Sequence, residues 1–126
     1  MFEQDYMMRL VKEIARVLAK ILFNIDSETF EEDLSQRIEK NEILDDILDL
    51  VDDGNINEAE NQIYDLMKSG RASDIETALL FYSYLNDQTD EFLETNNFSR
   101  EEIKLGIETL ADSCGLNGLV NVFVAE

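Results

Sequence analysis

Four basic side chains near the N-terminus are spaced for one face of a helix. They are Arg9, Lys12, Arg16 and Lys20. Residues three or four positions apart lie side by side on a helix, so these cations form one stripe. Residues 9–20 hold these four basic residues and one acidic residue, whereas the whole chain has 10 basic and 29 acidic residues and a net charge of -19. Such a stripe attracts anionic groups, and we take its four residues as candidate partner-binding residues.

The basic stripe has three interpretations. It binds the anionic surface of a membrane, it binds a partner protein, or it pairs with acidic residues of the same chain. The third interpretation is favoured, because opposite charges within one chain meet at high local concentration. The acidic candidates opposite the stripe are Glu31, Glu32, Asp45, Asp46 and Asp49.

The residue types that most catalytic and metal sites require are missing. The chain has no histidine and a single cysteine, Cys114, which we interpret as a small buried residue on a helical face. Ser-His-Asp sites, Cys-His sites and a disulfide within the chain are therefore excluded. Adjacent carboxylates occur at many places, so no catalytic pair stands out. We expect no enzymatic activity, no catalytic residue, no cofactor and no metal site.

One stretch, residues 49–60, resembles a calcium-binding EF-hand loop. The matching residues are Asp49, Asp53, Gly54, Ile56 and Glu60, at loop positions 1, 5, 6, 8 and 12. Position 3 is occupied by Val51, whose side chain has no oxygen ligand. Because Val51 also continues the apolar pattern of the preceding segment, we expect an ordinary turn between helices without a specific calcium site.

Composition indicates one domain built from helices. The chain has 126 residues, of which 44% are hydrophobic, so it is long and apolar enough to bury a core. It has no proline to interrupt helices, and strand patterns are almost absent. Its acidity argues against a nucleic-acid partner, because phosphates would be repelled. Charges interrupt the longest apolar stretch, residues 14–25, and no signal peptide is visible, so we expect a cytoplasmic protein.

Apolar periodicity predicts five or six helices. They cover residues 2–24, 26–53, 55–69, 73–93 and 99–114, and the second range holds two helices if Asn41 caps a fresh one. The first helix has a broad apolar arc made of Met7, Leu10, Val11, Ile14, Val17, Leu18, Ile21 and Leu22. The fourth begins at Ser73 or Asp74, with a stripe made of Ala78, Leu79, Tyr82, Leu85, Phe92 and Leu93.

The clearest helix boundary lies at Ser99. Glu102, three residues later, completes a capping box, in which each residue's side chain binds the other's backbone N–H. Phe98 and Ile103 are placed to form a hydrophobic staple across this boundary. We therefore predict that the last helix starts here.

The region around residue 54 resembles a tetratricopeptide-type helical hairpin. The residues that carry the resemblance are Gly54, Ala59 and Ile63 at the turn and packing positions, with Ile43, Leu50 and Leu66 at apolar positions. Only one repeat is visible, so the resemblance implies hairpin packing and not an array of true repeats.

Longer segments carry a second resemblance. They are residues 1–9 (MFEQDYMMR), 57–61 (NEAEN), 78–82 (ALLFY) and 97–103 (NFSREEI). Together they resemble a domain-of-unknown-function family of small, acidic, uncharacterised helical proteins from Gram-positive bacteria, over the chain up to about Leu116. The resemblance implies a cytoplasmic helical protein, and it brings no activity, ligand or catalytic residue.

We therefore expect an all-α fold, an antiparallel helical-hairpin array of five to six helices with tetratricopeptide-like packing. Residues 1–126 form one domain, with a basic amphipathic helix over 1–24, an acidic helical core over 26–116 and an apolar tail over 117–126. The favoured function is a non-enzymatic protein–protein interaction module that binds another protein or a second copy of itself. The alternative is a peripheral membrane or regulatory protein that uses the first helix. The acidic charge favours a partner surface that is basic or apolar.

Overall fold

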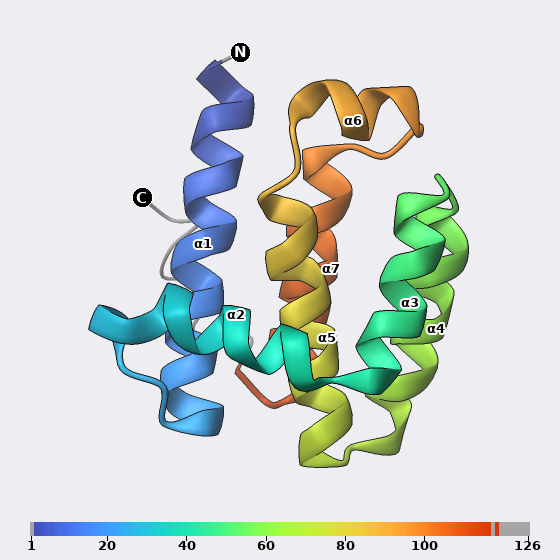
Figure 1. Cartoon of the computed structure of the whole chain (residues 1–126). Helices are drawn as coiled ribbons and strands as arrows, with labels where there is room; N and C mark the ends of the chain where they lie inside the picture. The colour runs from blue at the N-terminus through green and yellow to red at the C-terminus, as the bar shows by residue number, and fades with distance from the viewer. Residues whose placement is uncertain (1, 117, 119–126) are drawn as a thin grey trace.

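The chain folds into helices joined by short turns. A computed structural model describes the backbone of residues 2–116 and 118 and the side chains of residues 5–116 and 118. The elements are α1 (Phe2–Phe23), a single 3₁₀ turn (Ser27–Thr29), α2 (Phe30–Lys40), α3 (Glu42–Asp52), α4 (Ile56–Ser69), α5 (Ala72–Asn86), α6 (Asp90–Thr95) and α7 (Arg100–Ser113) (Figure 1). The all-α class is confirmed, since the described residues include no strand. The apolar tail proposed for residues 117–126 lies outside them, apart from residue 118.

The number of helices corrects the prediction of five to six. The described part of the chain contains seven α-helices. One boundary that we left open lies at Asn41, which has an extended backbone with a ψ of 100°. Its side-chain oxygen accepts a hydrogen bond from the backbone N–H of Leu44 at 2.9 Å and so caps α3. The alternative of a fresh helix at Asn41 is therefore the correct one.

The helix predicted over residues 73–93 is wrong as a single element. It starts earlier, at Ala72, and stops at Asn86. A second helix, α6, then begins after Thr89, whose side chain accepts a hydrogen bond from the backbone N–H of Phe92 at 3.0 Å. The apolar stripe that we drew from Ala78 to Leu93 thus spans two helices separated by a turn.

The break between α5 and α6 has a physical cause in Arg100, at the start of α7. Its guanidinium donates hydrogen bonds to the carbonyl of Asn86 at 3.0 Å and to the carbonyl of Gln88 at 2.6 Å. It also donates to Asp90 Oδ1 at 2.6 Å. These hydrogen bonds satisfy carbonyls that a helix continuing past Asn86 would bond to its own backbone N–H groups.

The helix boundary at Ser99 is confirmed in detail. The Ser99 hydroxyl accepts a hydrogen bond from the backbone N–H of Glu102 at 3.1 Å, and the Glu102 carboxylate accepts one from the backbone N–H of Ser99 at 2.8 Å. Phe98 and Ile103 are both buried, as expected of a hydrophobic staple.

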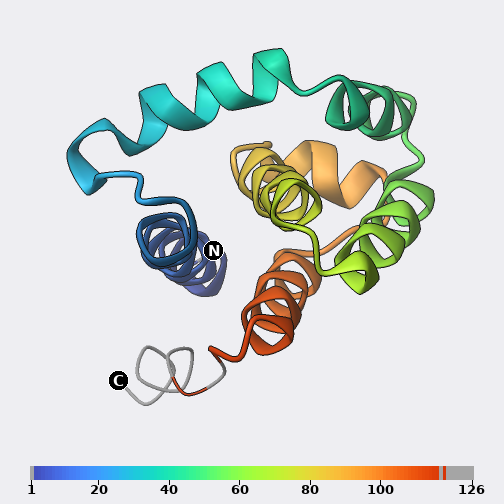
Figure 2. The same cartoon turned by 90° about the horizontal axis from the view of Figure 1, so that it is seen from below.

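Helix α5 lies at the centre of the molecule. Helices α1, α2, α3, α4 and α7 each pack against it, and they are arranged around it in Figure 2. Its buried apolar residues are Ile75, Ala78, Leu79, Leu80, Phe81, Tyr82 and Leu85, which cover all sides of the helix. A helix that is apolar all round is stable in water only when other elements enclose it.

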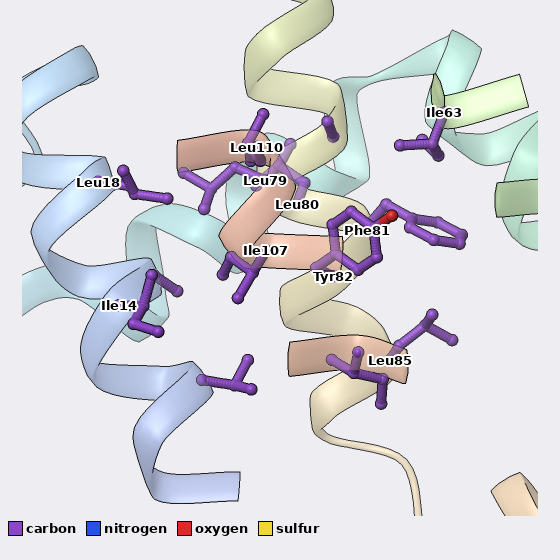
Figure 3. Close-up of a cluster of buried hydrophobic side chains, with 14 of the residues drawn as sticks. Ile14, Leu18, Ile63, Leu79, Leu80, Phe81, Tyr82, Leu85, Ile107 and Leu110 are labelled. Atoms are coloured by element: carbon purple, nitrogen blue, oxygen red, sulfur yellow. The ribbon is translucent and has the colours of Figure 1, made fainter. Parts of the chain in front are cut away.

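Helix α1 packs along α5 and α7, as its apolar arc predicted. Ile14 and Leu18 are fully buried and lie opposite side chains of α5 and α7 in the core (Figure 3). The arc is shifted from our prediction, because Ala15 and Ala19 are buried whereas Ile21 is 53% exposed. Within the described residues, no helix combines the length and apolar character needed to cross a membrane.

Helices α5 and α7 approach closely at Gly106. The Tyr82 ring lies against this glycine, and an alanine Cβ there would overlap the ring edge, 2.6 Å from the hydroxyl oxygen. Tyr82 is fully buried and packs edge-on against Phe81, with ring centres 5.2 Å apart. The ring therefore has little room to move away from an added methyl group.

We predict that Gly106→Ala destabilises the protein. Overpacking costs roughly 1–3 kcal/mol, which outweighs the ~1 kcal/mol that alanine gains over glycine inside a helix. Thermal and urea unfolding measure the difference. As a control, the same substitution in a Tyr82→Leu background should cost much less, because the obstructing ring is gone. Equal costs in both backgrounds would show that the ring does not require this glycine.

Candidate functional site

A groove lies between α1, α2 and the C-terminal part of α5. Its volume is about 770 Å³, within the range of ligand-binding clefts. From α2 it is lined by residues at helical spacing, namely Phe30, Glu31, Leu34, Ser35, Ile38 and Glu39. From α1 it is lined by Val11, Lys12 and Ala15, and from α5 and the turn after it by Ser83, Tyr84, Asn86, Asp87 and Gln88.

The groove combines an apolar wall with charged groups. Phe30 and Leu34 are buried, and Ile38 is half-buried against the core. Lys12 forms an ion pair with Glu31, and this hydrogen-bonded cation holds the pKa of Glu31 below its usual value. Burial raises the pKa of Asp87, while the charge of Lys12 acts in the opposite direction. The cation of Lys12 thus sits between two carboxylates.

Two polar atoms at the groove are buried without a hydrogen-bond partner among the described residues. One is Oδ1 of Asn86, a residue only 3% exposed. The amide nitrogen of Asn86 donates to the carbonyl of Met8 at 2.9 Å, which fixes the amide so that oxygen is the unsatisfied end. The other atom is the hydroxyl oxygen of Ser83. Unsatisfied buried acceptors are rare and require an explanation.

The basic stripe is mostly engaged within the chain. Lys12 pairs with Glu31, which was one of the expected acidic residues. Lys20 pairs with Asp26 at 2.9 Å, which we did not expect. The guanidinium of Arg16 lies over the Phe30 ring, 5.5 Å from its centre. Among the described residues, no ion pair joins the stripe to the other acidic candidates, Glu32, Asp45, Asp46 and Asp49.

Arg9 is the stripe residue without an ion pair among the described side chains. It lines a second hollow of about 590 Å³, which also involves Met8, Asn86 and Asp87. Asn86 and Asp87 therefore line both the groove and this hollow. Of the four candidate partner-binding residues, the structure brings Lys12 and Arg9 to this region, whereas Arg16 and Lys20 do not line it.

Sequence reasoning missed the groove residues of α5. Ser83, Asn86 and Asp87 follow the most apolar segment of the chain, and we treated them as the middle of a longer helix. The available signal in the sequence was a polar residue, Asn86, at the end of an apolar segment. The structure buries this residue, unlike an ordinary surface asparagine.

A second polar cluster lies between α4, α5 and α7. The Tyr82 hydroxyl donates a hydrogen bond to Glu60 Oε2 at 2.8 Å, and the Tyr64 hydroxyl lies 3.4 Å from the same oxygen. Burial raises the pKa of Glu60, helped by the nearby charge of Glu102 and opposed by the two tyrosines. Burial and the charge of Glu60 also raise the pKa of Tyr82.

The EF-hand-like stretch has the geometry of an ordinary turn between helices. Val51 is fully buried in α3, and Gly54 closes the turn with a φ of +87°. Glu60, the would-be last ligand, binds tyrosine hydroxyls instead. In the described residues no group of three or more metal-ligating side chains comes together. Cys114 is half-buried and packs against the core.

These observations define an all-helical domain with a central enclosed helix and one mixed apolar and charged groove. The chain belongs to a family of unknown function, DUF6483, whose model matches residues 1–115. The resemblance to a family of unknown function is thereby confirmed over nearly all of the chain. No curated protein and no solved structure matches the chain.

We predict that Glu60→Gln raises the melting temperature by a few degrees at pH 7. Because the folded-state pKa of Glu60 is raised, the folded protein keeps this proton after the unfolded chain has lost it. The free energy of unfolding therefore falls as pH rises between the two pKa values, and a neutral glutamine avoids this loss. The gain should shrink toward pH 4.

The matched control is Glu58→Gln, which removes the same charge from an exposed position of α4. Melting curves from pH 4 to pH 8 compare both variants with the unmodified chain. If both variants raise the melting temperature equally at every pH, relief of general repulsion is the cause and burial of Glu60 is not.

Proposed function

We propose that this protein is a non-enzymatic protein–protein interaction module that binds its partner in the groove between α1, α2 and α5. The observation that carries the proposal is the groove itself, about 770 Å³ in volume, whose lining combines apolar residues with exposed charged groups. A partner chain that packs in the groove and places polar groups against the exposed carboxylates would match both kinds of lining.

A binding role suits the groove chemistry better than a catalytic one. Ser83 is the one serine that lines the groove from α5, and its hydroxyl oxygen has no hydrogen-bonded base among the described residues. An activated nucleophile needs such a base within hydrogen-bond reach. The proposal places the module in the cytoplasm of a Gram-positive bacterium, as the sequence resemblance implies, and includes tetratricopeptide-like packing of the α3–α4 hairpin.

The alternative, a peripheral membrane protein that uses α1, has weaker support. A membrane-surface helix presents its apolar face to lipid. In α1 that face is packed against α5 and α7, with Ile14 and Leu18 fully buried. A second copy of the chain is a further alternative partner, which the experiment below distinguishes.

A bulky side chain in the groove tests the proposal. Ser35 is exposed on α2 and lines the groove, whereas its neighbour Gln36 is exposed and does not. We expect Ser35→Trp to abolish capture of a defined set of proteins from extracts of the source cell, with Gln36→Trp as the matched control that retains them. Quantitative mass spectrometry of proteins bound to the full chain gives the comparison.

Two results would contradict the proposal. The first is an identical set of captured proteins with both tryptophan variants. The second is binding to vesicles of anionic phospholipid, measured by sedimentation, that accounts for all association and is the same in both variants. Light scattering of the protein alone reports a second copy as the partner, and Ser35→Trp should then dissociate the dimer.

A further inference from the structure

The groove has an excess of negative charge on its rim. Glu31, Glu39 and Asp87 line it, and Lys12 is the one cation among its lining residues. Lys12 pairs with Glu31, and none of the ion pairs among the described residues involves Glu39 or Asp87. These two carboxylates come from α2 and from the end of α5, so they flank the apolar wall from two helices.

We propose that the groove binds a basic amphipathic helical segment of a partner protein, whose apolar side packs on the half-buried Ile38 and whose cationic groups meet Asp87 and Glu39. The proposal rests on the proposed function and specifies the partner's chemistry. Its support is the arrangement of accessible groups in one groove, namely the half-buried Ile38 and the two exposed carboxylates of Glu39 and Asp87.

Asn86 and Asp87 are adjacent in the groove lining. The Asn86 side chain is buried, and its amide nitrogen donates to the Met8 carbonyl, whereas the Asp87 carboxylate is exposed. An ammonium or guanidinium group of a partner donates hydrogen bonds to such an exposed carboxylate. An acidic segment has neither the donors nor the charge for this position.

The dimensions suit a short helix. The lining residues of α2 extend from Phe30 to Glu39, nine residue steps along a helix. At 1.5 Å per step this corresponds to about 14 Å, or roughly two and a half turns of a bound helix. A partner helix of that length places apolar residues at intervals of three and four along the wall.

A second copy of the chain fits this surface poorly. Its net charge of -19 would be repelled by the groove rim. Its one basic segment is in α1, where Lys12 and Lys20 are already paired with Glu31 and Asp26. The occupant is therefore a different protein with a basic face.

Two synthetic peptides of 14 residues test the proposal, a length of about four helical turns. Both carry the same leucine face, and the opposite face is lysine in one and glutamate in the other. We expect the lysine peptide to bind the full-length protein with one-to-one stoichiometry, measured by fluorescence anisotropy, and the glutamate peptide not to bind. The affinity should fall with added salt, since the contacting charges are exposed.

Variants separate binding in the groove from general attraction to an acidic protein. The double variant Glu39→Gln, Asp87→Asn should bind the lysine peptide with about tenfold lower affinity, a loss of ~1.4 kcal/mol. The matched double variant Asp45→Asn, Asp46→Asn removes the same charge from exposed positions of α3 outside the groove, and its affinity for the peptide should fall by less than twofold. Ser35→Trp should abolish binding, and unchanged melting curves would show that the variants fold.

The outcomes distinguish this inference from the proposed function. Equal weakening by both charge-neutralised pairs, or no binding of the lysine peptide, would overturn the basic-partner inference. Binding of the glutamate peptide that Ser35→Trp abolishes would also overturn it, while leaving the groove as a docking site. The proposed function itself fails if capture of cellular proteins does not depend on Ser35, or if binding to anionic vesicles accounts for all association.

Discussion

The enclosure of α5 is the constraint on which the rest of the structure depends. This helix carries apolar side chains on every face, from Ile75 to Leu85, and water would contact them if neighbouring helices did not. Burial of a large apolar side chain contributes about 1.5–3 kcal/mol, so a single open face would be costly. Five helices therefore surround α5. Short turns are enough to join these helices, because each helix needs to contact only α5 and the helices next to it. Close approach of α7 then requires the glycine at position 106.

A chain of polar contacts fixes how this assembly ends at the groove. Arg100 is 5% exposed, and its hydrogen bonds to the carbonyls of Asn86 and Gln88 and to Asp90 satisfy a charge that would otherwise be costly to bury. The same contacts terminate α5 at Asn86. The side chain of Asn86 in turn donates to Met8 of α1. The start of α7, the end of α5 and the wall of the groove are thus positioned together.

Local sequence signals predicted the parts of the fold that local interactions determine. The capping box at Ser99 and the cap at Asn41 are read from a few adjacent residues, and both are present. The split between α5 and α6 was missed because its cause, the guanidinium of Arg100, lies 14 positions beyond Asn86. Periodicity also assumes one buried face for each helix, which holds for α3 and fails for α5.

The groove was missed for a related reason. A groove is a property of three helices at once, and the sequence shows only which face of each is apolar. The basic stripe was visible, but its destinations were not: Arg16 stacks on Phe30 and Lys20 reaches Asp26 through a local turn. Only the pairing of Lys12 with Glu31 had been anticipated. Long flexible cations reach many acidic residues in so acidic a chain, so composition alone does not select the partner.

Occupation of the groove would link binding to stability. The groove is lined by α1, α2 and the end of α5, which are separate segments of the sequence. The buried side chain of Asn86 donates to the Met8 carbonyl and so joins α5 to α1 at this lining. A ligand that binds the folded chain and not the unfolded one raises the free energy of unfolding. A partner held against lining residues of all three helices would therefore stabilise them together, because its binding surface is lost when these helices separate.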